Sequence, residues 1–143
     1  MPDVSRLSIG RKGGRVLDQE WLDAYVAGLK SFDGGMTLKT NDELLEIKRL
    51  LAGFQPDTKS VILRSDATLF EAVHELGHVK FFSQIGSDAN VYKSFETAGR
   101  ELEAWRHVLD YADQYPGRLS TEEMQFAREM FNEEFYRLFG AVK

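Results

Sequence analysis

The stretch that most constrains this chain is Phe70–Phe82, FEAVHELGHVKFF, where two of the three histidines lie four residues apart inside an apolar run. Thr68 and Glu71 have the spacing of a capping box, and Gly86 is suited to end a helix. The pattern therefore predicts a helix over about residues 69–84. On a helix, residues i and i+4 project from one face at neighbouring turns, so both histidines face the same way.

The remainder of the chain alternates helical patterns with short extended segments. Asp18 can cap the first helix, Gly53 is expected to stop the second, and Ser120 with Glu123 forms a capping box for the last. The predicted helices cover residues 17–32, 41–51, 94–114 and 120–139, and the predicted strands cover residues 36–39 and 60–64. We therefore expect a helix-rich α+β fold with a small β-sheet.

The composition limits the class of protein. A chain of 143 residues is enough for one domain with one core, so we expect a single domain over residues 16–143 after a flexible arm at residues 1–15. The net charge of −5 argues against a nucleic-acid partner, because such domains carry a basic surface. The basic cluster of the arm, GRKGGR, is interpreted as solvated. No apolar run approaches the ~20 residues of a membrane span, and no signal peptide follows the first residue.

The two histidines on one helix face indicate a metal site. The chain has no cysteine, so the ligands must be histidines and carboxylates. His74 and His78 could bind one zinc ion through imidazole nitrogens at about 2.0–2.1 Å. Glu75 lies about 100° around the helix from His74, where it can contact a water molecule held by the metal. This is the arrangement of an HExxH motif, and Gly77 inside it leaves room for another segment to approach.

The third ligand must come from another segment, because a catalytic zinc site has three protein ligands and an open position. A longer motif with a third histidine nearby needs glycine at position 81 and histidine at position 84, where the chain has Phe81 and Gln84. Two glutamates of the following helix remain, Glu101 and Glu103. The expected buried stripe of that helix consists of Phe95, Ala98, Leu102, Trp105, Leu109 and Ala112.

Helical periodicity favours Glu101 over Glu103. At about 100° per residue, Glu101 lies on the flank of the stripe, whereas Glu103 lies on the opposite, solvent-facing side. We predict Glu101 as the third ligand, with Glu103 as the alternative. His107 shares the polar face with Glu103 and is expected to be solvated. The candidates for contacting substrate, or for stabilising the oxyanion that forms when water attacks a carbonyl, are Tyr92, Arg100 and Tyr111.

These residues give the sequence a resemblance to the zincin-like metallopeptidase toxin domains of bacterial polymorphic toxins. The resemblance covers about residues 13–138. Its HExxH core is typical of zincins as a whole, whereas the surrounding pattern is less specific to the toxin group. The segments that carry it are GGRVL, SVILRSDAT, HELGHVKFF, Ile85–Gly86, Tyr92, Arg100–Glu101 and LSTEEMQFA.

The resemblance implies a zincin-like fold of the gluzincin type, in which the HExxH helix and the next ligand-bearing helix pack on a small sheet. It implies that His74, His78 and Glu101 bind one zinc ion and that Glu75 is catalytic. It also implies the C-terminal domain of a larger secreted effector, which acts on a protein in the cytoplasm of a target cell. A cognate immunity protein would inhibit it, and Met1–Pro2 would be a processing boundary.

The sequence departs from better-known gluzincins at one position. Many thermolysin-like enzymes have an aspartate or asparagine four residues after the ligand glutamate, where this chain has Trp105. That residue usually orients a ligand histidine, so the group with this role is not identified from the sequence.

The expected function is that of a zinc-dependent peptidase. The alternative is a metal-containing binding or regulatory module that has the same fold and no proteolytic activity. Peptide substrates of zincins commonly lie along a sheet edge, so we expect the strand at residues 60–64 to pair with the substrate. Phe81 and Phe82 are expected in the core.

Overall fold

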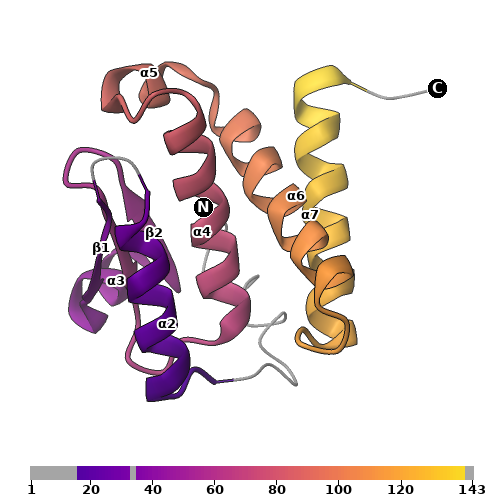
Figure 1. The fold of residues 1–143 in the computed structure, drawn as a ribbon. Helices are drawn as coiled ribbons and strands as arrows, with labels where there is room; N and C mark the ends of the chain where they lie inside the picture. The colour runs from indigo at the N-terminus through magenta and orange to yellow at the C-terminus, as the bar shows by residue number, and fades with distance from the viewer. Residues whose placement is uncertain (1–15, 33–34, 141–143) are drawn as a thin grey trace.

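The computed structural model describes residues 16–32 and 35–140. It confirms the helix-rich α+β class with a small sheet (Figure 1). The predicted arm at residues 1–15 lies outside the described residues. The elements in chain order are α2 (Gln19–Lys30), β1 (Thr37–Thr40), α3 (Asp42–Lys48), β2 (Ala52–Gln55), β3 (Ser60–Leu63), α4 (Leu69–Gln84), α5 (Ala89–Ser94), α6 (Thr97–Gln114) and α7 (Thr121–Phe139).

The sheet has three strands in the order β1-β3-β2. The predicted strand at residues 60–64 is β3, and it lies in the centre, parallel to β1 and antiparallel to β2. The expected end of the second helix was wrong. Arg49 adopts a left-handed conformation with φ of 56° and ends α3 at Lys48. Gly53 therefore lies within strand β2 and does not stop a helix.

Arg64 fixes the short connection between α3 and β2. Its guanidinium donates two hydrogen bonds to the carbonyl of Leu50, at 3.0 and 2.7 Å, and a third to Glu46 at 2.9 Å. The two bonds to Leu50 satisfy a carbonyl that lies in the connection itself, after α3 and before β2. The start of β2, a strand that was not predicted, thus depends on the side chain of Arg64, fourteen residues after Leu50 in the chain.

Helix α4 lies between the sheet and α6, and α7 covers the other side of α6 (Figure 1). Apolar side chains surround α4, and most of its residues are buried. On the sheet side they join a core cluster that includes Val61, Leu63, Val79 and Phe82. On the helical side they join a second cluster that includes Phe70, Val73, Trp105, Val108, Phe126 and Met130. The HExxH helix is consequently the centre of the molecule, and polar groups on it must find partners within the protein.

The helix predicted from residue 94 begins later, at Thr97, and a short helix that was not predicted, α5, precedes it. Phe95 and Glu96 both have extended backbone angles, so α5 ends at Ser94 and α6 begins at Thr97. Phe95, which was predicted in the buried stripe, lies outside α6 and is 40% exposed. Of the predicted stripe, Ala98, Leu102 and Leu109 are only half-buried, so the buried stripe of α6 is shifted around the helix from the predicted one. The buried residues of α6 are Glu101, Ala104, Trp105, Val108 and Ala112.

Gly77 allows α4 and α6 to approach each other closely, as its position in the motif predicted. A Cβ atom at Gly77 would lie only 2.8 Å from Cα and 3.0 Å from the carbonyl oxygen of Ala104. The same atom would lie 3.0 Å from Cβ of His107. Both neighbours belong to α6, so the two ligand-bearing helices are in backbone contact at this point.

The expectation for His107 was wrong, because this side chain is half-buried against Gly77 and not solvated. Its Nε2 atom has no hydrogen-bond partner among the described residues. Burial, together with the nearby positive charge of Lys80, lowers the pKa of His107 to about 4. This histidine is therefore neutral at physiological pH, and its packing against α4 is consistent with that.

The two predicted capping boxes differ in detail. Ser120 and Glu123 form the full reciprocal motif at the start of α7, as predicted. At the start of α4, Thr68 makes no bond to a helix N–H group, and its hydroxyl donates to the carboxylate of Glu71. The capping box predicted for Thr68 and Glu71 therefore gave the correct start of α4 but the wrong hydrogen bond.

We expect Glu123→Gln to stabilise the protein at neutral pH and above. Glu123 is fully buried, and burial raises its pKa from 4.5 to about 7, with a contribution from the charge of Glu71. A folded-state pKa above the unfolded value means that this carboxylate reduces stability as pH rises from about 4.5 to 7. Glutamine keeps an oxygen that can accept from the Ser120 N–H, as Glu123 does at 2.9 Å, and it does not ionise.

Melting curves of both proteins between about pH 4.5 and 8 measure this effect. The melting temperature of the variant should exceed that of the wild type by a margin that grows over this range. Glu122→Gln is the control, because Glu122 is the exposed neighbour in the same helical turn. A margin that does not change with pH would contradict the assignment to Glu123.

Candidate metal centre

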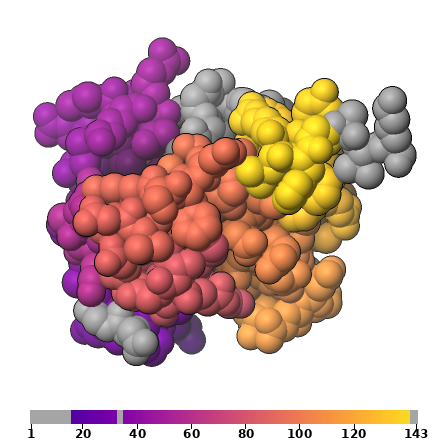
Figure 2. All heavy atoms as spheres, turned by 90° about the horizontal axis from the view of Figure 1, so that it is seen from above, coloured from indigo at the N-terminus to yellow at the C-terminus, as the bar shows by residue number. Residues whose placement is uncertain are grey.

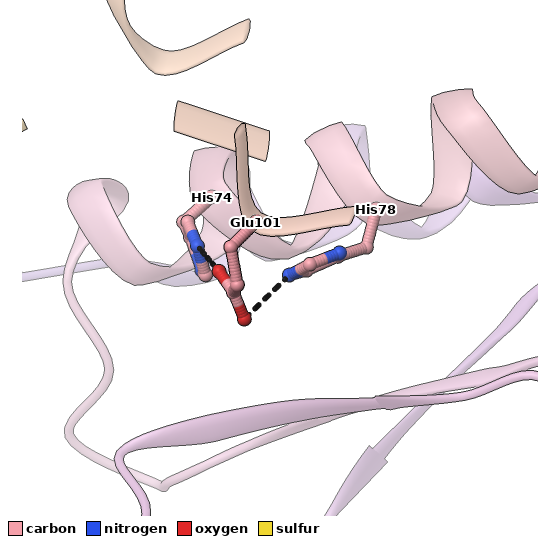
Figure 3. Close-up of side chains that lie close together, drawn as sticks. All are labelled: His74, His78 and Glu101. Atoms are coloured by element: carbon pink, nitrogen blue, oxygen red, sulfur yellow. Dashed lines mark hydrogen bonds and ion pairs between the residues drawn. The ribbon is translucent and has the colours of Figure 1, made fainter. Parts of the chain in front are cut away.

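Two histidines of α4 and a glutamate of α6 meet in the core (Figure 3). Nε2 of His74 lies 2.9 Å from Oε2 of Glu101, and Nε2 of His78 lies 3.4 Å from Oε1 of the same carboxylate. One possible ligand atom from each residue lies within 4.8 Å of the others. All three side chains are buried. The structure thus brings together the three residues that were predicted as ligands.

The charges of this group are strongly coupled. Burial lowers the pKa of His74, but the carboxylates of Glu101 and Glu75 outweigh this effect and raise the pKa to about 9. Burial raises the pKa of Glu101, but His78 and His74 outweigh it and hold the pKa well below its usual range. The buried carboxylates therefore require a positive charge between them, which a proton on His74 or a bound cation can supply.

The donor atoms fit a metal ion. Two imidazole nitrogens and one carboxylate are a known ligand set of catalytic zinc sites. Nε2 of His78 is buried and makes no hydrogen bond among the described residues, although it faces Glu101. A buried nitrogen of this kind costs free energy unless it finds a partner, and a cation between the three residues would provide one.

Glu75 lies beside this group and has no exposed surface. Its Oε2 lies 3.0 Å from Nδ1 of His74, whereas Oε1 has no hydrogen-bond partner among the described residues. Glu75 lines a cavity of about 310 Å³, which Glu101 and His78 also line. The remaining residues that line it are Phe54, Pro56, Tyr92, Lys93, Thr97 and Arg100. An acidic side chain with a free oxygen therefore adjoins both the candidate ligands and a cavity that can hold another molecule.

The cavity lies between the turn after β2 and the helices α5 and α6. In the view from above, α5 and the start of α6 lie between the purple segments that precede β3 and the yellow helix α7 (Figure 2). An ion pair joins the two walls, because Nζ of Lys93 lies 2.5 Å from the carboxylate of Asp57. Both side chains are largely exposed, so this pair is open to screening by salt.

Two of the residues proposed for substrate or oxyanion contacts lie at the cavity. Tyr92 is buried, and its hydroxyl lies 3.1 Å from Nδ1 of His78. The guanidinium of Arg100 lies over the ring of Tyr92 at 5.1 Å and donates to Thr97 at 3.1 Å. The structure therefore places Tyr92 against a candidate ligand and Arg100 on the cavity wall.

Two other candidates lie elsewhere. The hydroxyl of Tyr111 accepts a hydrogen bond from Arg118 at 3.2 Å, and the ring lines a separate cavity between α2, α4 and α6. Glu103, the alternative third ligand, forms an ion pair with Arg106 at 3.3 Å on a different side of α6. Neither residue reaches the His74, His78 and Glu101 group in the structure.

Sequence reasoning missed two features of the site. Trp105 packs against His74, with ring centroids 4.2 Å apart, at the position where the sequence departs from better-known gluzincins. Phe54 lines the cavity from β2, the strand that was not predicted. The expected pairing of substrate with residues 60–64 is wrong, because β3 is the central strand and both of its edges are occupied. The strand that adjoins the cavity is the edge strand β2.

A histidine pair on one helix, a glutamate from another and a second glutamate at a cavity are what a hydrolase that uses a metal ion requires. Comparison with known families agrees with this class. The family model described as metallopeptidase toxin 4 matches residues 5–137, nearly the whole chain. The chain belongs to this family and is a metallopeptidase toxin domain.

Neither the curated proteins nor the solved structures that were compared contain a match to the chain. Within residues 16–32 and 35–140, no helix combines the length and apolar character needed to cross a membrane.

Proposed function

We propose that this domain is a zinc-dependent peptidase of the gluzincin type that cleaves a protein of the target cell. His74, His78 and Glu101 would hold one zinc ion, and Glu75 would be the general base. The observation that carries the proposal is the set of three ligand atoms within 4.8 Å of one another, beside a cavity that Glu75 lines. Membership of a metallopeptidase family supports it.

When bound, zinc acts as a Lewis acid that lowers the pKa of water and polarises the carbonyl of the scissile bond. Glu75 would accept a proton from the attacking water and transfer it to the nitrogen of the leaving amine. The C–N bond breaks, and the oxygen of the water becomes part of the new carboxyl group. Oε1 of Glu75 is suited to this role because it has no competing hydrogen bond among the described residues.

The metal content of purified variants tests the ligand set. We expect about one zinc ion per wild-type chain and almost none in His74→Ala or Glu101→Ala, because two ligands do not retain a zinc ion through purification. Glu103→Ala is the matched control, since it removes a glutamate from the same helix that forms an ion pair with Arg106. Elemental analysis gives the zinc content, and circular dichroism checks the fold. Unchanged zinc in both ligand variants would rule out this assignment.

We further propose for this domain the biological setting that the sequence resemblance implies. The domain would be the C-terminal part of a larger secreted effector and would act in the cytoplasm of a competing cell. A small immunity protein that covers the cavity would protect the producing cell. Co-purification of the domain with the product of the adjacent reading frame tests this partner, and the absence of both binding and relief of toxicity would exclude it.

A further inference from the structure

We infer that Tyr92 is a positioning residue that orients the imidazole of His78 for metal binding. This inference rests on the proposed metal site and gives a role to a residue that was first considered for the oxyanion. The hydroxyl of Tyr92 lies 3.1 Å from Nδ1 of His78, and Nε2 of the same ring faces Glu101 at 3.4 Å. The two contacts lie on the two nitrogens of one ring, so Tyr92 supports the nitrogen that does not face the ligand group.

The packing around Tyr92 fixes the position of its hydroxyl. The ring makes edge contacts with Phe54 and Phe82, with centroids 5.5 and 5.6 Å apart. Arg100 covers the ring at 5.1 Å, and the side chain as a whole is 4% exposed. Because these neighbours come from β2, α4 and α6, the ring cannot turn away without disturbing three elements.

The chemistry of a phenol suits this role. Burial raises the pKa of Tyr92, so the hydroxyl stays neutral and can both donate and accept a hydrogen bond. When Nδ1 of His78 carries the proton, it donates a hydrogen bond to the hydroxyl, and the lone pair of Nε2 is available to a metal ion. When Nε2 carries the proton, the same hydroxyl can donate to Nδ1. A carboxylate in this place would favour only the first arrangement.

No other described residue offers this contact to His78. The position that bears an acid in many gluzincins is Trp105, whose ring packs on His74 at 4.2 Å and has no acceptor atom to offer. Nδ1 of His74 faces Glu75 at 3.0 Å. Each histidine therefore has its own partner at Nδ1, and for His78 that partner is Tyr92.

Tyr92→Phe tests the inference, because it removes the hydroxyl and keeps the ring contacts. Titration of the metal-free protein with zinc should show an affinity about tenfold weaker than that of the wild type. Nitrogen-15 spectra of the histidine side chains give a second measurement that does not depend on activity. The zinc-loaded wild type should show a slowly exchanging Nδ1 proton on His78, and the variant should lose it.

Tyr111→Phe is the matched control, since it removes a tyrosine hydroxyl that bonds Arg118 away from the site. This variant should retain the zinc affinity and the His78 signal. Wild-type affinity in Tyr92→Phe, or the absence of an Nδ1 proton on His78 in the zinc-loaded wild type, would overturn the inference and leave the proposed metal site intact. Failure of the wild type to bind zinc would instead overturn the proposed function, and the inference with it.

Discussion

Glu75→Gln should abolish both peptide hydrolysis and toxicity while leaving the fold and the zinc content unchanged. The glutamine has almost the same shape but cannot accept a proton, and general base catalysis contributes a factor of about a thousand to such reactions. The fold should tolerate the change because Oε1 makes no hydrogen bond among the described residues. A side-chain amide can still present an oxygen or a nitrogen to Nδ1 of His74, which Oε2 contacts at 3.0 Å.

Labelling of protein N-termini in cells that express the wild type or Glu75→Gln is the most informative measurement. New termini that occur only with the wild type would identify the substrate. Glu103→Gln is the control, because it removes the charge of a glutamate that does not line the cavity of Glu75. Full toxicity of Glu75→Gln, with identical termini in both cultures, would favour the alternative of a binding or regulatory module.

Gly77→Ala should destabilise the protein by about 2–3 kcal/mol, since an added methyl group overpacks a tight contact. The new Cβ would lie 2.8 Å from Cα of Ala104, and a backbone atom cannot move unless the helix moves with it. Helices α4 and α6 must therefore separate. His74 and His78 are on one of these helices and Glu101 is on the other, so zinc affinity should fall together with stability.

Gly99→Ala is the control for this prediction. Gly99 also lies in a helix, α6, but a Cβ atom there would meet nothing within 4 Å. Alanine at an open helical position should stabilise the protein by up to about 1 kcal/mol. Urea denaturation with the linear extrapolation gives both values. Equal stabilities of the two variants would show that the contact at Gly77 is not tight in solution.

The sequence predicted some elements well because their signals are local. Helix α4 has the predicted bounds because the apolar run, the residues at its start and Gly86 at its end all agree. Strand β2 was missed because its boundary depends on the left-handed Arg49 and on the distant side chain of Arg64. Arginine is not a residue type that favours a left-handed conformation, and Arg64 is distant in sequence from the start of β2.

The candidate site shows the same difference between local signals, which the sequence contains, and contacts between distant segments, which it does not. Helical spacing placed His74, His78 and Glu101 on facing surfaces, although the buried side of α6 is centred nearer to Ala104 and Val108 than expected. The spacing could not show which tyrosine reaches the site. Tyr92 does so because α5 turns the chain between α4 and α6, and that short helix has no periodic apolar pattern long enough to detect.

The short sequence separation between the ligands bears on how the domain folds. His74 and Glu101 are 27 positions apart, and the intervening segment is mostly helical. Contacts that are close in sequence form quickly during folding, because little loop entropy is lost. The metal-binding residues should therefore come together at a stage similar to the parallel pairing of β1 with β3, whose partners Thr37 and Ser60 are 23 positions apart.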